Sequence, residues 1–208
     1  MGKMNVLSLS ILSFLSGSLM FSYWIGKLLG VDLRNIRDGN PGAFNLWHAK
    51  GPFWGFLGVV LDFMKGFLPA FIIIKSGLVS GWGVIPVGIA PVLGHAFSPF
   101  MGFKGGKAID VSFGVWSGIE FFRVSLAWAI CLLFLFIIIK IILRREVSPK
   151  NSATIILMGM LPVSVFMFFS GVSNLIIILW FLNLFLLLCT HHAEVSEAIP
   201  FFRQEKTI

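Results

Sequence analysis

Two polar stretches of the chain combine residue types that could bind a phosphorylated ligand. The first, residues 31–45, is too polar and too rich in glycine and proline to cross a membrane, so we expect a loop. The guanidinium groups of Arg34 and Arg37 match phosphate oxygens, and the amides of Asn40 and Asn45 suit hydroxyl groups. An ordinary loop at a membrane surface would also carry arginines. From this loop alone, both interpretations stay open.

The second stretch, residues 94–107, contains a pair of glycines between two lysines. Gly105 and Gly106 lie between Lys104 and Lys107, just before an expected helix. A helix N-terminus with exposed N–H groups and nearby cations favours an anion. His95 could act as a general base or a phosphate ligand, with a structural hydrogen-bonding role as the alternative. The spacing is not that of a Walker A loop, which excludes a nucleotide triphosphatase of that type.

Other chemistries are not supported by the sequence. We find no Ser-His-Asp pattern and no metal-ligand spacing, and therefore expect neither a metal nor a cofactor. Cys131 and Cys189 lie in separate apolar runs and are interpreted as packing residues. The net charge is +7, but no basic run alternates with aromatic residues, so nucleic acid is not an expected partner.

The elements that must position these residues are apolar. Of the 208 residues, 57% are hydrophobic and only 12% are charged, which excludes an ordinary water-soluble surface. Because a membrane-spanning helix needs about 20 apolar residues, we predict an all-α integral membrane protein with a single transmembrane domain over 1–208. It would have about seven transmembrane helices. The apolar segments are 5–29, 52–74, 79–101, 108–118, 124–143, 153–170 and 172–190. Fusion of the short fourth segment with the fifth would leave six.

The distribution of cations predicts which ends of these helices face the cytoplasm. With seven spans, eleven Lys and Arg residues fall on one side and three on the other, and the richer side is normally cytoplasmic. We therefore expect a multi-pass protein of the inner (plasma) membrane, with its polar loops on the cytoplasmic face. The eleven are Lys27, Arg34, Arg37, Lys50, Lys104, Lys107, Arg144, Arg145, Lys150, Arg203 and Lys206; the three are Lys3, Lys75 and Arg123.

Some residues inside the apolar segments also invite an interpretation. Asp62 and Lys65, three residues apart on one helical face, could form a structural ion pair or line a polar site. Small residues at four-residue spacing predict close approach of helices in lipid. These pairs are Gly51 and Gly55, Gly77 and Gly81, and Gly114 and Gly118.

Seven short motifs follow one another along the chain. They are Gly17-Ser18, Gly26-Lys27, Asp32-x-Arg34, Gly39-Asn40-x-Gly42-Ala43-x-Asn45, Asp62-x-x-Lys65-Gly66, Gly94-His95 and Phe103-Lys104-Gly105-Gly106-Lys107. In order and spacing these motifs resemble those of the bacterial acyl-phosphate-dependent glycerol-3-phosphate acyltransferases. The resemblance covers the first half of the chain closely and the rest mainly by its pattern of apolar segments.

The resemblance implies a seven-span enzyme of phospholipid biosynthesis with a cytoplasmic site. Its substrates would be acyl phosphate and glycerol 3-phosphate, its products lysophosphatidate and phosphate, and its surroundings membrane lipid. By the resemblance, Ser18, His95 and Lys104 are catalytic, and Arg34, Asn40, Asn45, Gly105, Gly106 and Lys107 bind substrate. Arg34 and Lys104 would hold phosphate charge, Gly105 and Gly106 would present backbone donors, and Ser18 and Asn45 would bind the glycerol portion.

The chain also departs from the family pattern at several positions. It has Asp38 for Ser, Phe44 for Thr, Ala108 for Gly and Val111 for Thr, and near the C-terminus it has His192, Glu194 and Glu197 for Arg, Asn and Arg. An acid in these places opposes phosphate binding unless a cation neutralises it. The alternative expectation is therefore a catalytically altered homologue that binds a lipid phosphate or a protein partner. A small transporter ranks below both, because no paired half-repeat is visible.

Overall fold

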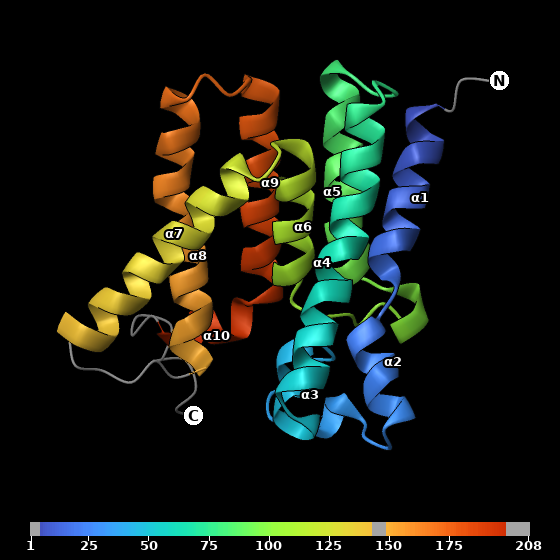
Figure 1. Cartoon of the computed structure of the whole chain (residues 1–208), viewed down its shortest axis with the longest axis vertical. Coiled ribbons are helices and arrows are strands. Elements are labelled where there is room, and N and C mark those ends of the chain that lie inside the picture. Colours follow the sequence, from blue (N-terminus) through green and yellow to red (C-terminus); the bar gives the residue numbers. More distant parts are fainter. Residues whose placement is uncertain (1–4, 143–148, 199–208) are drawn as a thin grey trace, which may run out of the picture. The chain divides into compact units, whose positions relative to one another are not determined.

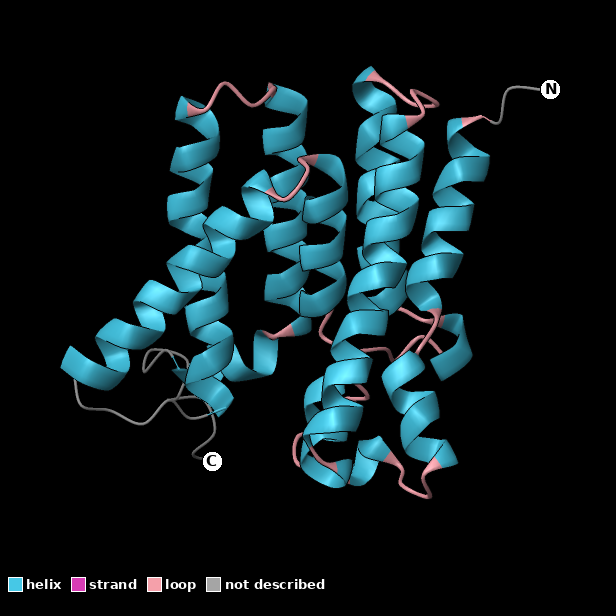
Figure 2. Cartoon of the chain, in the orientation of Figure 1, coloured by secondary structure: helices cyan, strands magenta, loops and turns pink. Residues whose placement is uncertain are grey.

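The structure is a computed structural model that describes residues 5–142 and 149–198. Within these ranges every regular element is a helix, as Figure 2 shows. The chain forms two compact units, residues 1–123 and 124–208, which are described separately below. The predicted all-helical class is confirmed, while the single transmembrane domain over 1–208 stays a prediction.

From residue 5 on, unit 1 has six α-helices, and the short turns and two longer loops that join them include three 3-10 turns (Figure 1). The helices are α1 (Val6–Ser18), α2 (Phe21–Leu28), α3 (Ala43–Lys50), α4 (Pro52–Lys75), α5 (Val84–Ala96) and α6 (Ile109–Ile119). The loops 29–42 and 97–108 lie at one end of the unit, together with α3, and the turns 76–83 and 120–122 lie at the other. The end that holds the two loops and α3 is called the polar end.

Unit 2 has four helices in the part of the chain that the structure describes. They are α7 (Arg123–Ile137), which ends in a π-helical turn, α8 (Pro149–Phe169), α9 (Asn174–Thr190) and α10 (His192–Ala198). Trp128 and Trp180 are fully buried at its centre and meet edge to face, 5.5 Å apart. Their indole N–H groups donate to the carbonyls of Ile156 and Met160, which satisfies both polar atoms inside an apolar core.

Among the residues whose side chains the structure describes, four helical stretches are long and apolar enough to cross a membrane, and three more are apolar but shorter. The four are Val6–Leu28, Pro52–Lys75, Gly81–Met101 and Arg123–Ile141; the shorter ones are Ile109–Ile119, Thr154–Phe169 and Asn174–Thr190. These stretches coincide with the seven predicted segments. Integral membrane character is supported, and the number seven remains a prediction.

The first spanning stretch is broken between α1 and α2, and the freed backbone groups find partners. The Ser98 hydroxyl donates to the Ser18 carbonyl over 2.7 Å, and the Lys65 ammonium donates to the Leu19 carbonyl. Lys65 also pairs with Asp62 at 2.7 Å, and both side chains are buried. Irregular backbone inside an apolar region survives only where such donors satisfy it. The pair therefore has a structural role, and its other predicted role, lining a polar site, stays a prediction.

Close helix contacts in unit 1 depend on glycine. A Cβ atom at Gly114 or Gly118 of α6 would overlap the α4 backbone near Phe63 and Phe71, so the predicted close approach is confirmed there. The same prediction was wrong for Gly77 and Gly81. They lie around the turn after α4 with φ of +63° and +58°, and apart from their chain neighbours no atom of the described residues lies within 4 Å of their Cβ positions.

Candidate active site

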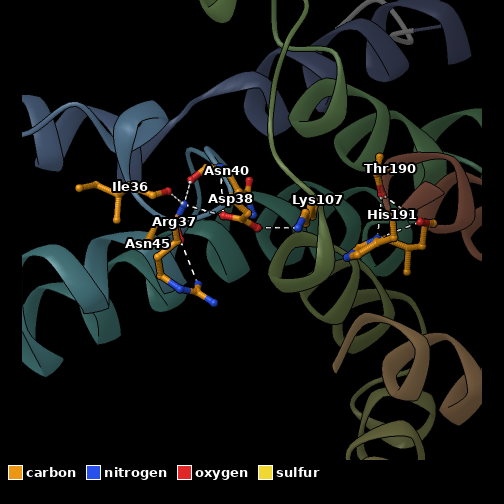
Figure 3. A network of polar contacts seen from close by, with 9 residues as sticks. Ile36, Arg37, Asp38, Asn40, Asn45, Lys107, Thr190 and His191 are labelled. Carbon is orange, nitrogen blue, oxygen red and sulfur yellow. Dashed lines mark hydrogen bonds and ion pairs between the residues drawn. The ribbon is translucent and has the colours of Figure 1, made fainter. Parts of the chain in front are cut away.

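The loop before α3 is held together by one buried amide. The Asn45 Nδ2 atom lies 2.8–2.9 Å from the carbonyls of Ile36 and Asn40 and from Asp38 Oδ1, and its Oδ1 accepts a hydrogen bond of 3.1 Å from Arg37 Nη1 (Figure 3). Only 2% of Asn45 is exposed. The Asn45 NH₂ group has two hydrogens, and three acceptor oxygens already surround it, so it has no free hydrogen for a further partner. Asn45 therefore shapes the loop, and its predicted role as a hydroxyl ligand stays untested.

The two polar loops meet through an ion pair. Lys107 Nζ lies 2.6 Å from Asp38 Oδ2, as Figure 3 shows. Burial tends to raise the pKa of Asp38, but hydrogen bonds from Lys107 and Asn45 outweigh it and bring the pKa below its usual value. The carboxylate is thus ionised at neutral pH and offsets the charge of Lys107. The expected neutralisation of this acid is found, with Lys107 as the partner.

The glycine pair does not point its N–H groups at a ligand. The N–H of Gly105 donates to the Ala96 carbonyl over 3.0 Å, and that of Gly106 donates to the His95 carbonyl over 3.1 Å. The predicted role of these two groups as anion donors is therefore wrong in this structure. Glycine is needed here for close approach, because a Cβ at either position would overlap the backbone or ring of His95.

Two buried polar groups converge over Gly106 without partners. His95 is 4% exposed, and its Nδ1 atom has no hydrogen-bond partner among the described residues. Asn40 Oδ1 is also buried and without a partner, and it lies 3.2 Å from the Cβ position of Gly106, which the His95 Nε2 atom borders as well. Buried polar atoms are nearly always paired in folded proteins. One exception belongs to loop 29–42 and the other to the last turn of α5, and the Asn40 oxygen and the His95 ring border the same position beside Gly106.

The remaining predicted cations differ in their surroundings. Lys104 is exposed, and no carboxylate of the described chain pairs with it. Arg34 binds Asp32 through Nε at 3.0 Å and Nη2 at 2.7 Å, and Lys27 binds the same carboxylate at 2.8 Å. The Asp32 hydrogen bonds hold the pKa of Arg34 above its usual range, and those of Arg34 and Lys27 hold the pKa of Asp32 well below it. Arg34 therefore belongs to a separate ionic cluster beside Tyr23.

Ser18 lies in the packing of α1 against α5. It is fully buried, and its hydroxyl donates to the Phe14 carbonyl one turn earlier over 2.7 Å. The Cβ position of Gly94 overlaps the same Phe14 carbonyl and lies 2.9 Å from the Ser18 nitrogen. The structure thus brings Asn40, His95, Gly106 and Lys107 together, and the predicted catalytic role of Ser18 stays a prediction.

Sequence reasoning missed the joint arrangement of Arg37, Asp38 and Phe44. The Arg37 guanidinium lies 4.6 Å from the centre of the Phe44 ring, and Asp38 pairs with Lys107. One feature of the sequence could have predicted this arrangement: the acid Asp38 directly follows Arg37 in a loop that carries several cations. The C-terminal Glu194 belongs to unit 2, and the side chain of Glu197 lies outside the described residues, so their predicted proximity to the site stays a prediction.

Comparison with known proteins gives consistent results. A sequence profile of the family described as glycerol-3-phosphate acyltransferase matches residues 7–199. Glycerol-3-phosphate acyltransferase 1 of Thermotoga maritima is 35% identical over 191 residues, covering 89% of this chain and 94% of that protein. The enzyme of Thermosipho melanesiensis is 33% identical, covering 94% and 90%.

Solved structures agree with the sequence relatives. The crystal structure of PlsY (YgiH), an integral membrane glycerol 3-phosphate acyltransferase, in its glycerol 3-phosphate form, is 31% identical with a TM-score of 0.81. The match covers 95% of this chain and 93% of that one. The lysophosphatidic acid form of the same protein gives 30% identity and a TM-score of 0.80 over the same shares.

Proposed function

This chain belongs to the glycerol-3-phosphate acyltransferase family, and we propose that it transfers an acyl group from acyl phosphate to glycerol 3-phosphate in the membrane. The products are lysophosphatidate, for phospholipid synthesis, and phosphate. The observation that carries the proposal is the convergence of His95 and Asn40 over Gly106, beside the cations of the second loop. Such a place suits a substrate that brings both hydroxyl groups and phosphate charge.

The reaction needs one bond to form and one to break. A hydroxyl oxygen of glycerol 3-phosphate attacks the carbonyl carbon of acyl phosphate, and the bond from that carbon to the bridging phosphate oxygen breaks. His95 takes the hydroxyl proton and returns it to the leaving phosphate. Asn40 Oδ1 accepts a hydrogen bond from the second hydroxyl, and Lys104 stabilises the charge that develops during the transfer.

The polar end of unit 1 faces the cytoplasm in this proposal. Six cations lie at that end, and Lys75 and Arg123 lie at the other. The positive-inside rule then supports a multi-pass protein of the inner (plasma) membrane. Both substrates carry phosphate, and the polar end is where they would approach from water.

A turnover assay with three variants tests the proposal. Purified protein in non-ionic detergent receives acyl phosphate and glycerol 3-phosphate, and lysophosphatidate is measured. We expect His95→Gln to lower kcat by about 100- to 10,000-fold, and Lys104→Gln to lower kcat/KM by about 10- to 100-fold. Lys75→Gln, which removes a cation at the opposite end, is the matched control and should be unaffected. Absence of product from folded wild-type protein would contradict the proposal.

A further inference from the structure

The carboxylates at the polar end already hold three of its six cations. Asp32 binds Arg34 at 2.7 Å, with Lys27 on the same carboxylate, and Asp38 binds Lys107 at 2.6 Å. An ion pair offsets much of the field that a lone cation would present to a phosphate. The attraction of this surface for an anion must therefore depend on cations outside these pairs.

Arg37 is such a cation, and it is held in a defined position. Its Nη1 atom donates to Asn45 Oδ1 over 3.1 Å, and its guanidinium carbon lies 4.6 Å from the centre of the Phe44 ring. No carboxylate of the described residues pairs with it, and its side chain is exposed. One N–H group is used by Asn45, which leaves the other donors of the fork for a ligand.

The backbone of Arg37 is strained in a way that secures this position. Its φ is +51°, a left-handed conformation that residues with a Cβ rarely adopt. Such strain persists only where the surrounding structure imposes it, and it is frequent at ligand sites. Here the Asn45 amide imposes it, since it binds the Arg37 side chain together with the carbonyl before it and the Asp38 carboxylate after it.

We propose that Arg37 binds the phosphate group of a substrate, with Phe44 and Asn45 holding the guanidinium in place. The inference rests on the proposed function and adds a specificity-determining residue to it. A guanidinium presents a planar fork to two phosphate oxygens, and an aromatic face beneath it reduces the freedom lost on binding. The ligand class is a phosphate monoester dianion, carried by glycerol 3-phosphate or by acyl phosphate.

The proposal predicts opposite effects for the two neighbouring charges. Arg37→Gln should weaken binding of the phosphorylated substrate by about 10- to 100-fold, because a charge-assisted pair is lost. Asp38→Asn removes a negative charge beside the same ligand and should strengthen binding by about two- to tenfold. Phe44→Leu, which removes only the ring, should weaken it by about two- to fivefold. Arg37→Lys should weaken binding less than Arg37→Gln, because lysine keeps the positive charge. It should still bind less tightly than wild type, because lysine lacks the fork.

The test combines kinetics with direct binding at fixed ionic strength. KM is measured for each substrate in turn in non-ionic micelles, and binding of glycerol 3-phosphate and of inorganic phosphate is measured by calorimetry. The matched control is Lys50→Gln, an exposed cation at the end of the same helix α3 as Phe44. Selective loss for one substrate identifies which phosphate Arg37 holds.

Three outcomes would overturn the inference. They are unchanged KM and calorimetric affinity in Arg37→Gln, equal losses in Arg37→Gln and Lys50→Gln, and a loss seen only in anionic vesicles, which would assign Arg37 to lipid headgroups. The calorimetric binding measurement tests this inference independently of the proposed function, because it does not require turnover. A wild-type protein that binds glycerol 3-phosphate without turnover would contradict the function, while the affinity of Arg37→Gln would still decide the role of Arg37.

Discussion

At position 38 a carboxylate lies among cations, and its partners explain why it can stay there. Lys107 binds one oxygen at 2.6 Å, and the Asn45 amide binds the other at 2.8 Å. The sequence identified Asp38 as an obstacle to phosphate binding, because the chain alone does not reveal which of several cations reaches it. The pairing across 69 residues of sequence depends on how loop 97–108 folds back onto α5.

Replacement of Asp38 should have a small, pH-dependent effect on stability. The side chains of Asp38 and Lys107 are 36% and 23% exposed, so we expect Asp38→Asn to lower the free energy of unfolding by about 1 kcal/mol or less at pH 7. The folded-state pKa of Asp38 is lowered, so this contribution is present above the unfolded pKa of about 3.9 and is lost as pH falls through the folded value. Thermal unfolding from pH 3 to 8 measures it. A difference that vanishes already at pH 6 would contradict the assignment.

Ala108 is a second residue that differs from the family pattern, which has glycine at this position. It adopts φ of +63° before α6. An L-residue in this conformation costs about 1–2 kcal/mol, so glycine is the natural occupant. Ala108→Gly should leave the free energy of unfolding unchanged or raise it by about 1 kcal/mol. The control Ala90→Gly, at a buried position inside α5, should lower it by about 1 kcal/mol. Equal destabilisation of both variants would show that the backbone at 108 is not strained.

Sequence predicted which residues gather at the site better than it predicted what they do. His95, Asn40 and Lys107 were named from motifs, and the structure brings them together. The direction of the Gly105 and Gly106 N–H groups was not predictable. A glycine pair allows either donation to an anion or close contact with another segment, and only the contact with α5 distinguishes the two.

At the scale of elements, α1 and α5 approach each other so closely at two glycines that no side chain fits at those positions. The Cβ positions of Gly17 and Gly94 overlap the backbone of Pro91 and Phe14 respectively. Apolar length predicted both helices, because hydropathy identifies segments that avoid water. It could not predict their pairing. The four-residue glycine spacing wrongly predicted a close helix contact at Gly77 and Gly81, because the same spacing also occurs around a turn.

The α1–α5 contact makes a direct prediction about packing. Gly94→Ala puts a methyl group onto backbone that cannot move aside, and we expect the free energy of unfolding to fall by about 1–3 kcal/mol. Gly159→Ala in α8 is the matched control, because the nearest atom there is a methyl group of the Leu132 side chain, which can rotate. Its change should stay within about 1 kcal/mol. Unfolding in detergent measures both, and similar losses would refute the backbone overlap.

For the whole molecule, the uneven distribution of charge predicts its orientation in the membrane. Asn35 in the loop before α3 and Ser80 in the turn before α5 are both exposed and lie at opposite ends of unit 1. In a background with Cys131 and Cys189 replaced by alanine, we expect Asn35→Cys to react with an impermeant maleimide only in inside-out vesicles. Ser80→Cys should react only in right-side-out vesicles. Labelling of both from one side would contradict a membrane-crossing α4, and reversed labelling would contradict the orientation.

The most direct test of the account follows an oxygen atom through the reaction. Purified protein is given acyl phosphate and glycerol 3-phosphate whose hydroxyl oxygens carry ¹⁸O, and both products are analysed by mass spectrometry. Attack by the hydroxyl on the carbonyl carbon predicts that the label stays in lysophosphatidate, with one unlabelled phosphate released for each molecule formed. Label in the released phosphate, or phosphate released without lysophosphatidate, would contradict acyl transfer to glycerol 3-phosphate by this chain.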